Sequence, residues 1–260
     1  MDRRVRIALG WVFLIVAGVA CSSEKTPGAA PGATNTAAAA TMALPTFGPG
    51  ASYRPVYAAA DFTANVDNPW FPLKPGTTFV YVGTKDGLAA RELFKPTSRV
   101  KMIAGVPCRV VDDKLYLKGK LAEVTLDYYS QDKAGNVWYF GEDTKSIDEN
   151  GKIDTSGTWL TGVDGAFPGV FMEADPQLGR EFRQEWYKGE AEDQFKVVSL
   201  ADHVSVSYGT YETALRTEES TTLEPEILDN KYYIRGVGEV LEVQVKGPPP
   251  IERLELKEIT

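Results

Sequence analysis

The chain has 260 residues, 36 of them acidic and 28 basic, with a formal net charge of −8 at pH 7. This acidity argues against a nucleic-acid partner and against electrostatic docking on anionic lipid. One histidine and two cysteines are too few for a zinc site built from the usual histidine and cysteine ligands. We therefore expect no nucleic acid, no metal and no cofactor.

The first twenty residues have the pattern of a secretory signal peptide. Three arginines fall within the first six residues, and residues 7–20 carry no charge. This run of about fourteen residues has the length of a signal-peptide core and is shorter than the roughly twenty residues of a transmembrane helix. The small residues before Cys21 resemble a bacterial lipobox, with Gly18 where leucine is commoner. These features predict a signal peptide over 1–20 and lipidation of Cys21.

Two other interpretations of this start stay open. Cleavage after Ala20 without lipidation would release a secreted protein, and a retained apolar run would itself be a membrane anchor. Lipidation predicts an exported protein held on the bacterial cell envelope through Cys21. By resemblance to lipoproteins of two-membrane bacteria, Ser22 after the cysteine implies the outer membrane in such a host. Loss of residues 1–20 removes a net charge of +2, so the mature chain is near −10.

A segment of low complexity follows the cysteine. Residues 21–50 are mostly Ala, Thr, Pro, Gly and Ser, with no aromatic side chain before Phe47. Such a segment cannot bury enough apolar surface to offset the conformational entropy lost on ordering. The alanine run at 37–40 favours a helical turn, but the prolines and glycines around the run stop a helix from extending. We predict a disordered linker over 21–50 and a single β domain over 51–260.

The domain is rich in strand patterns and shows no long helical period. In residues 122–128, Ala, Val, Leu and Tyr alternate with Glu, Thr and Asp, which predicts an antiparallel strand with one face in water. Many such runs at turn-marked spacing predict an all-β antiparallel meander that forms a curved open sheet or half-barrel, with a sandwich or closed barrel as alternatives. The other predicted strands are 77–82, 91–94, 97–103, 108–117, 137–140, 180–187, 195–200, 204–208, 211–217, 231–234, 237–245 and 254–256.

The turn at residues 132–136 invites comparison with a calcium loop. Asp132 and Asn136 could supply oxygen ligands, but Ala134 occupies the position of a third carboxylate. No glutamate follows at the distance that a calcium loop requires. Asp, Gly and Asn are also ordinary turn residues, so we predict a plain hairpin turn.

Aromatic residues supply the candidate ligand contacts. Trp70 and Phe71 lie in a proline-rich turn before the first strand and form either the lip of a ligand site or a plug at one end of the core. Residues 158–179 are predicted as a long irregular loop, which either forms one wall of a ligand site or covers an open sheet edge. The candidate ligand-binding residues are Trp70, Phe71, Trp138, Phe140, Trp159, Phe167 and Phe171.

No catalytic residue stands out. If Cys21 is lipidated, Cys108 has no disulfide partner in the chain, and the only histidine, His203, is distant in sequence. Cys108 lies in an apolar run, which predicts a buried and inert thiol. The sequence contains no Gly-x-Ser-x-Gly elbow, P-loop or dinucleotide fingerprint after a strand.

Three stretches resemble motifs of a family of uncharacterised secreted bacterial lipoproteins. Residues 71–81 (FPLKPGTTFVY) are similar to its FPL-x-x-G-x-x-W-x-Y opening, with Phe79 in place of tryptophan. Residues 206–211 (VSYGTY) are similar to its V-x-x-G-T-[FY] turn, and residues 232–238 (YYIRGVG) to its closing YY-x-x-G-V-G. The resemblance covers most of the chain after the linker. It implies a curved antiparallel sheet with an apolar concave face, and its motifs carry no catalytic residue.

These features favour a binding function over an enzymatic one. The first hypothesis is a membrane-tethered envelope lipoprotein that binds an apolar or amphipathic small molecule against a concave sheet. The second is an interaction or envelope assembly module that docks another envelope protein through edge strands and loops. A hydrolase that works with carboxylates alone is the least favoured of the three.

Overall fold

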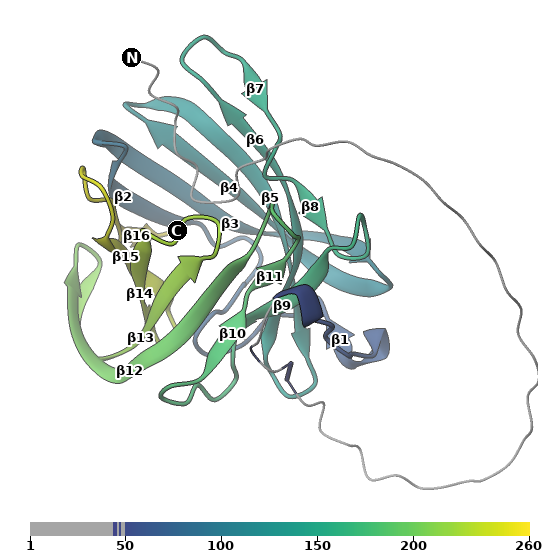
Figure 1. The fold of residues 1–260 in the computed structure, drawn as a ribbon. Coiled ribbons are helices and arrows are strands. Elements are labelled where there is room, and N and C mark those ends of the chain that lie inside the picture. Colours follow the sequence, from purple (N-terminus) through teal and green to yellow (C-terminus); the bar gives the residue numbers. More distant parts are fainter. Residues whose placement is uncertain (1–43, 46, 48–49) are drawn as a thin grey trace, which may run out of the picture.

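The computed structural model describes residues 44, 45, 47 and 50–260 (Figure 1). The predicted signal peptide, Cys21 and most of the predicted linker lie outside these residues. The described part contains strands and two short 3-10 helices, η1 (Gly50–Ser52) and η2 (Ala59–Asp61). The predicted all-β fold class is confirmed. No helix in the described part combines the length and the hydropathy needed to cross a membrane.

All strand pairs are antiparallel, and most strands follow a single path. Their order across the sheet is β10-β12-β13-β14-β15-β16-β2-β3-β4-β5-β6-β9-β11, while β1, β7 and β8 pair beside this path. The strands are β1 (Phe62–Thr63), β2 (Phe79–Lys85), β3 (Leu88–Ile103), β4 (Val106–Leu117), β5 (Lys120–Asp132), β6 (Val137–Ile147), β7 (Ile153–Asp154), β8 (Trp159–Leu160), β9 (Phe167–Met172), β10 (Glu181–Arg183), β11 (Glu185–Trp186), β12 (Asp193–Val206), β13 (Gly209–Thr221), β14 (Leu228–Ile234), β15 (Gly238–Lys246) and β16 (Arg253–Ile259).

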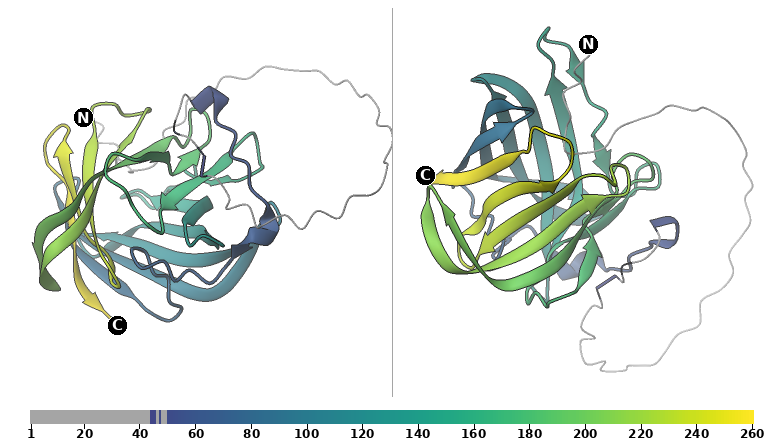
Figure 2. Two further views of the ribbon diagram at one scale, coloured as in Figure 1. Left: turned by 90° about the horizontal axis from the view of Figure 1, so that it is seen from below. Right: turned by 60° about the vertical axis from the view of Figure 1, so that its left-hand side comes forward.

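The sheet curls until its two ends meet at one seam (Figure 2). At the seam the chain leaves β10 at Gln184 and enters β11, so that residues 181–186 bridge β12 on one side and β9 on the other. Gly169 of β9 faces this crossing, and a Cβ there would lie 2.2 Å from the Arg183 carbonyl oxygen. Only glycine permits such a close backbone approach. The crossing also explains why the predicted strand 180–187 is broken into β10 and β11.

Long bulged strands produce the curvature. Residues 91–94 and 97–103 belong to one strand, β3, and residues 195–200 and 204–206 belong to β12, whereas residues 207 and 208, also predicted as strand, form the turn into β13. The β3–β4 register shifts between Pro96 and Val100, and the β12–β13 register shifts three times between Val197 and Val204. A bulge bends its strand and increases the local twist, so these shifts allow long strands to wrap around an interior.

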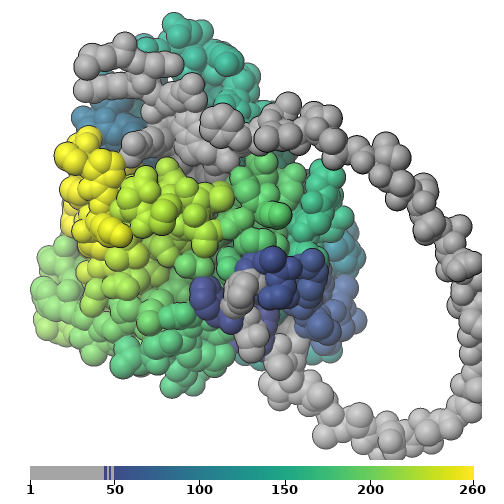
Figure 3. Space-filling view, in the orientation of Figure 1, coloured from purple at the N-terminus to yellow at the C-terminus, as the bar shows by residue number. Residues whose placement is uncertain are grey.

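The residues before β2 cover the outside of the sheet and its seam. The rings of Tyr57 and Phe62 pack against Trp138 and Phe140 of β6, with ring centroids 5.3–6.1 Å apart. Around η1, which is purple in Figure 3, the Tyr53 hydroxyl donates a hydrogen bond to the Pro168 carbonyl of β9 at 3.0 Å. This opening segment therefore ties the outer face to the seam.

Candidate functional site

Two ion-rich ladders face the inside of the curved sheet. Asp127 of β5 pairs with Glu142 of β6, and Lys231 of β14 pairs with Glu242 of β15. Strands β5 and β14 are not neighbours, yet Lys231 lies close enough to Asp127 to lower the pKa of that carboxyl. Both ladders must therefore point into the space that the sheet encloses. The carboxylates of this interior are Glu92, Asp113, Glu123, Asp127, Glu142, Glu185, Asp193, Glu219, Asp229, Glu239 and Glu242, and its lysines are Lys85 and Lys231.

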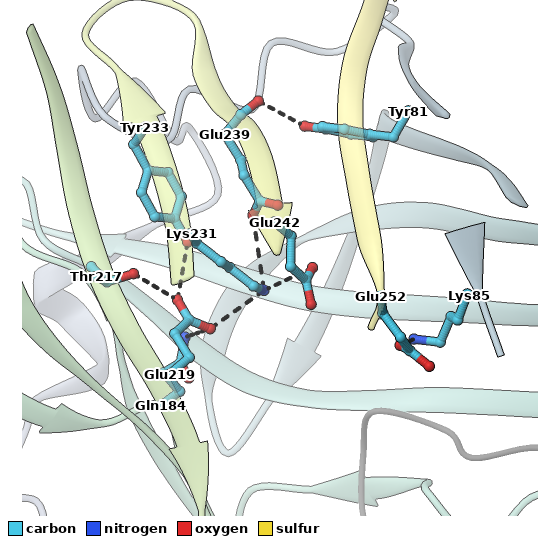
Figure 4. A network of polar contacts seen from close by, with 10 residues as sticks. All are labelled: Tyr81, Lys85, Gln184, Thr217, Glu219, Lys231, Tyr233, Glu239, Glu242 and Glu252. Carbon is cyan, nitrogen blue, oxygen red and sulfur yellow. Dashed lines mark hydrogen bonds and ion pairs between the residues drawn. The ribbon is translucent and has the colours of Figure 1, made fainter. Parts of the chain in front are cut away.

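Lys231 is shared among three carboxylates on neighbouring strands (Figure 4). Its Nζ lies 3.3 Å from Glu219 Oε2, 3.7 Å from Glu242 Oε2 and 3.9 Å from Glu239 Oε2. Burial acts to lower the pKa of Lys231, but the three carboxylates outweigh burial and hold the pKa well above its ordinary value. Lys231 is therefore charged, and these three carboxylates are its ion-pair partners. Glu219 also accepts hydrogen bonds from Thr217, Tyr233 and Gln184, at 3.1, 3.2 and 3.3 Å.

The rim of the interior holds the second lysine and a small space. Lys85 Nζ lies 3.8 Å from Glu252 Oε2. A cavity of about 10 Å³ beside Lys85, Glu242 and Glu252 has room for one water molecule. Burial raises the pKa of Glu239 to about 8, and burial together with the Glu242 charge raises the pKa of Glu92 to about 7. The two lysines therefore leave most interior carboxylates uncompensated.

A tyrosine joins two carboxylates deeper in the interior. The Tyr139 hydroxyl donates to Asp127 Oδ1 at 2.7 Å and also lies 3.2 Å from Glu142 Oε2. A tyrosine hydroxyl carries one proton, so Tyr139 donates to only one of these two carboxyl groups at a time. Burial, and then the charges of Glu185 and Asp127, raise the pKa of Glu142 well above its ordinary value.

The deepest carboxylates lack hydrogen-bond donors. Glu142 is 0% and Glu185 is 1% exposed. Neither Glu142 Oε1 nor either carboxylate oxygen of Glu185 has a hydrogen-bond partner among the described residues. The Trp159 indole lies beside Glu185 and acts to lower the pKa of that carboxyl, although no hydrogen bond of normal geometry joins them. The Asp193 backbone amide also acts to lower this pKa, but burial and the Asp193 charge outweigh both donors and raise the pKa of Glu185 well above its ordinary value.

An aromatic group adjoins the buried carboxylates of Glu142 and Glu185, which together with Asp127 form the acidic floor of the interior. Tyr129 stacks on Tyr139 with ring centroids 4.8 Å apart, and Trp159 meets Tyr139 edge to face at 5.5 Å. Phe171 lies 4.5 Å from Phe71 and 5.0 Å from Tyr129. Tyr139 and Trp159 lie beside the other aromatic rings and also beside the buried carboxylates. Apolar rings and carboxylates therefore meet in one place. The implied apolar concave face is therefore only part of an interior that is also strongly acidic.

The seven candidate aromatic residues separate into different places. Phe71, Trp159 and Phe171 come together in the inner aromatic group. Trp138 and Phe140 point to the opposite face of β6, in the layer with Phe62. The remaining two meet cations, since Arg235 lies 5.7 Å from the ring of Trp70 and Arg54 lies 4.7 Å from the ring of Phe167.

The stretch 158–179 contains two short strands between turns. β8 pairs with β6 at Glu142, and β9 extends the sheet beyond β6. Its Trp159 and Phe171 side chains join the inner aromatic group. Residues 158–179 therefore line the interior and also cover the sheet edge beyond β6.

The acidic residues of the floor were missed at the level of sequence. Alternation assigned Asp127 to a water-facing side of its strand, but Asp127 is buried and faces inward, so that assignment was wrong. Glu142 follows Val-Trp-Tyr-Phe-Gly, and Glu185 precedes Trp186 in a short aromatic run. In the sequence, the signal that could have identified these buried acidic residues is a glutamate flanked by aromatic residues.

The turn considered as a calcium loop is an ordinary hairpin turn. Asp132 accepts hydrogen bonds from the Ala134 and Asn136 backbone amides, the Asn136 side chain and the Trp138 indole, each at 2.9 Å. Its carboxylate oxygens are therefore occupied by donors of the chain. Elsewhere in the described ranges, no three side chains of His, Cys, Asp or Glu are arranged to hold a metal ion.

Comparison with known proteins assigns no family. No family model and no curated protein matches the chain. One similar solved structure is a protein described as exported, with a YmcC-like fold, from Bacteroides fragilis; it is 14% identical with a TM-score of 0.39, over 74% of this chain and 98% of that chain. Another is described as a lipoprotein from Parabacteroides distasonis, 11% identical with a TM-score of 0.41, over 73% and 97%. Similarity this low carries no argument about function.

Proposed function

We propose that the mature chain is a lipid-anchored protein of the bacterial cell envelope that binds an amphipathic small molecule inside its curved sheet. The basic start, the uncharged run and the small residues before Cys21 support export and lipidation. The meeting of unpartnered carboxylates with an aromatic group supports the ligand class.

The buried carboxylates of Glu142 and Glu185 carry this proposal. A buried polar atom without a hydrogen bond costs free energy, so nearly all buried polar groups in native proteins have partners. Here three such oxygens lie beside the rings of Tyr139 and Trp159. A purely apolar ligand would leave these oxygens unsatisfied. A ligand with a polar end and an apolar end would satisfy them and cover the rings as well.

Native mass spectrometry of the mature chain tests the binding function. The protein is purified from its membrane with a mild detergent, and its mass is compared before and after denaturation and organic extraction. We expect a stoichiometric small molecule that is released on unfolding. Recovery of the bare chain, together with a co-purifying protein that docks on the strand edges, would replace this function with the interaction hypothesis.

Fractionation of a Cys21→Ser variant tests the anchor. The variant is expected to move from the membrane fraction to the soluble fraction, because the thioether attachment point is lost. Cys108→Ser is the matched control and should stay with the membrane. A Cys21→Ser protein that remains membrane-bound would show that the uncleaved apolar run is the anchor.

A further inference from the structure

We propose that the polar end of the bound ligand is a protonated primary amine, which Glu142 and Glu185 receive at the floor of the interior. This inference rests on the proposed function and names the chemical class of its ligand.

The charge balance of the floor favours a cation. Lys231 is shared by Glu219, Glu239 and Glu242, and Lys85 is paired at the rim. Within the described part of the chain, neither Glu142 nor Glu185 has an ion-pair partner within 4.0 Å. Several uncompensated carboxylates in a small volume repel any anionic group and attract a cation.

The hydrogen-bond inventory favours an amine among cations. Glu142 Oε1 and both carboxylate oxygens of Glu185 accept no hydrogen bond of normal geometry, although the Trp159 indole and the Asp193 backbone amide lie beside Glu185. A primary ammonium brings three N–H donors and no acceptor. An alcohol brings a single O–H donor, and a quaternary ammonium brings charge without any donor. The primary amine is therefore the group that complements both the charge and the unfilled acceptors.

The aromatic neighbours favour an amine attached to an apolar body. The rings of Tyr139 and Trp159 border the carboxylates, and an aromatic face attracts a cation that lies over it. Behind them, the rings of Phe71, Tyr129 and Phe171 pack on one another and form apolar surroundings that suit a hydrocarbon portion.

Exposure increases from the floor to the rim. Glu142 is 0% exposed, the Glu219 side chain 11% and the Glu242 side chain 28%. Figure 4 shows Glu219, Glu239 and Glu242 converging on the Lys231 ammonium from adjacent strands. A cation attracted from solvent therefore meets the more exposed carboxylates around Lys231 before the fully buried Glu142.

Isothermal titration calorimetry with three probes of equal chain length tests the inference. Dodecylamine, dodecanol and dodecanoate are titrated below their micelle concentrations into the full mature chain at pH 7 and low salt. We expect dodecylamine to bind at least about tenfold more tightly than dodecanol, and dodecanoate to show no binding. Dodecyltrimethylammonium, which has charge but no N–H donor, should bind more weakly than dodecylamine.

Carboxamide variants locate the amine. The double variant Glu142→Gln/Glu185→Gln should lose the preference for dodecylamine by about tenfold or more while keeping its affinity for dodecanol. Glu173→Gln is the matched control, because Glu173 is also buried but pairs with Arg180 at 3.1 Å and lies outside the floor. This control should keep the preference. Thermal melts of each variant establish that it is folded.

The outcomes separate this inference from the function on which it rests. If dodecanol binds as tightly as dodecylamine, or if the double variant keeps the preference, the amine assignment is overturned and amphipathic binding stands. If dodecyltrimethylammonium matches dodecylamine, donation to the carboxylates is overturned. If no probe binds and the native protein carries no small molecule, the proposed function fails as well.

Discussion

The two faces of β6 differ in how their polar atoms are treated. On the outer face, the indole nitrogen of Trp138 donates to Asp132 at 2.9 Å, and the surrounding rings of Phe62 and Phe140 are apolar. On the inner face, Glu142 follows Tyr139 along the same strand and keeps an oxygen without a donor. Residues only a few positions apart therefore lie on an outer face where the buried indole nitrogen has a hydrogen-bond partner and on an inner face where a buried oxygen has none.

This difference separates the stabilising part of the protein from the part in which we propose that a ligand binds. Burying apolar rings with their few polar atoms paired contributes favourably to folding. Burying carboxylates beside one another opposes folding, because desolvation and like-charge repulsion both disfavour the ionised form. The outer layer thus compensates for an interior that is unfavourable when empty and charged.

Removal of the central ring of the outer layer should produce the largest effect. Trp138→Ala deletes a fully buried indole that packs against Phe62 and removes a donor from Asp132. We expect a loss of roughly 3–5 kcal/mol in the free energy of unfolding, measured by urea denaturation. A loss below about 1 kcal/mol would show that the outer layer is not the main source of stability.

Neutralising the floor should have the opposite sign. Glu142→Gln/Glu185→Gln removes two carboxylates whose pKa values are raised by burial and by neighbouring carboxylates. The variant should melt several degrees higher than the wild type at pH 8, since each kcal/mol corresponds to about 2–4 °C for a chain of this size. The gain should shrink as the pH falls toward the ordinary pKa of glutamate, because the unfolded wild-type chain then binds these protons as well. A variant that melts lower at pH 8 would contradict the comparison.

The wild-type protein should itself become more stable as the pH falls from 8 to 5. The pKa values of Glu92, Asp127 and Asp193 are raised to about 7 and that of Glu239 to about 8, with burial as the largest cause. The folded chain therefore binds more protons in this window than the unfolded chain, in which carboxyls titrate near pH 4. Linkage makes the free energy of unfolding fall as pH rises through it. Melting temperatures at constant ionic strength check the sign.

Sequence patterns predicted the elements of the fold well. Alternation and turn residues identified the strands and the Asp132 hairpin, because side-chain period and turn chemistry are local properties. Alternation also divided residues 122–128 into two faces. It did not decide which face would be enclosed, since that depends on the direction in which the whole sheet curls, and the acidic face became the inner one.

The candidate site was predicted only in its apolar half. Phe71, Trp159 and Phe171 meet as part of an inner aromatic group, whereas Trp138 and Phe140 have a packing role on the other face. The acidic half could not be found by composition, because carboxylates are almost always exposed and an acidic chain supplies many of them. Glu142 and Glu185 become distinctive only through their burial.

Truncation of the predicted linker sharpens the contrast between tether and domain. Leu44 packs on the main core, Arg183 lies 5.4 Å from the ring of Phe47, and the Trp186 ring occupies the place of a Gly50 side chain. A chain that starts at Ala51 should therefore lose roughly 1–2 kcal/mol in the free energy of unfolding, because these partly buried groups are removed. A chain that starts at Leu44 is the control and should match the mature protein. If the chain that starts at Ala51 and the chain that starts at Leu44 melt at the same temperature, all of residues 21–50 lie outside the fold.

The smallest effect is expected at Cys108, which belongs to the apolar environment of the outer face. Its thiol is 0% exposed, and burial raises its pKa to about 12, with Lys101 acting weakly in the other direction. Both features disfavour the thiolate that reacts with oxidants and alkylating reagents. Cys108→Ala should cost about 1 kcal/mol, since a single sulfur atom is removed from a packed site, and should leave dodecylamine binding unchanged. Iodoacetamide should label Cys108 of the wild type only in denaturant, and mass spectrometry of the protein measures this labelling. Rapid labelling of the folded chain would place the thiol in an accessible site and assign it to chemistry that its burial otherwise prevents.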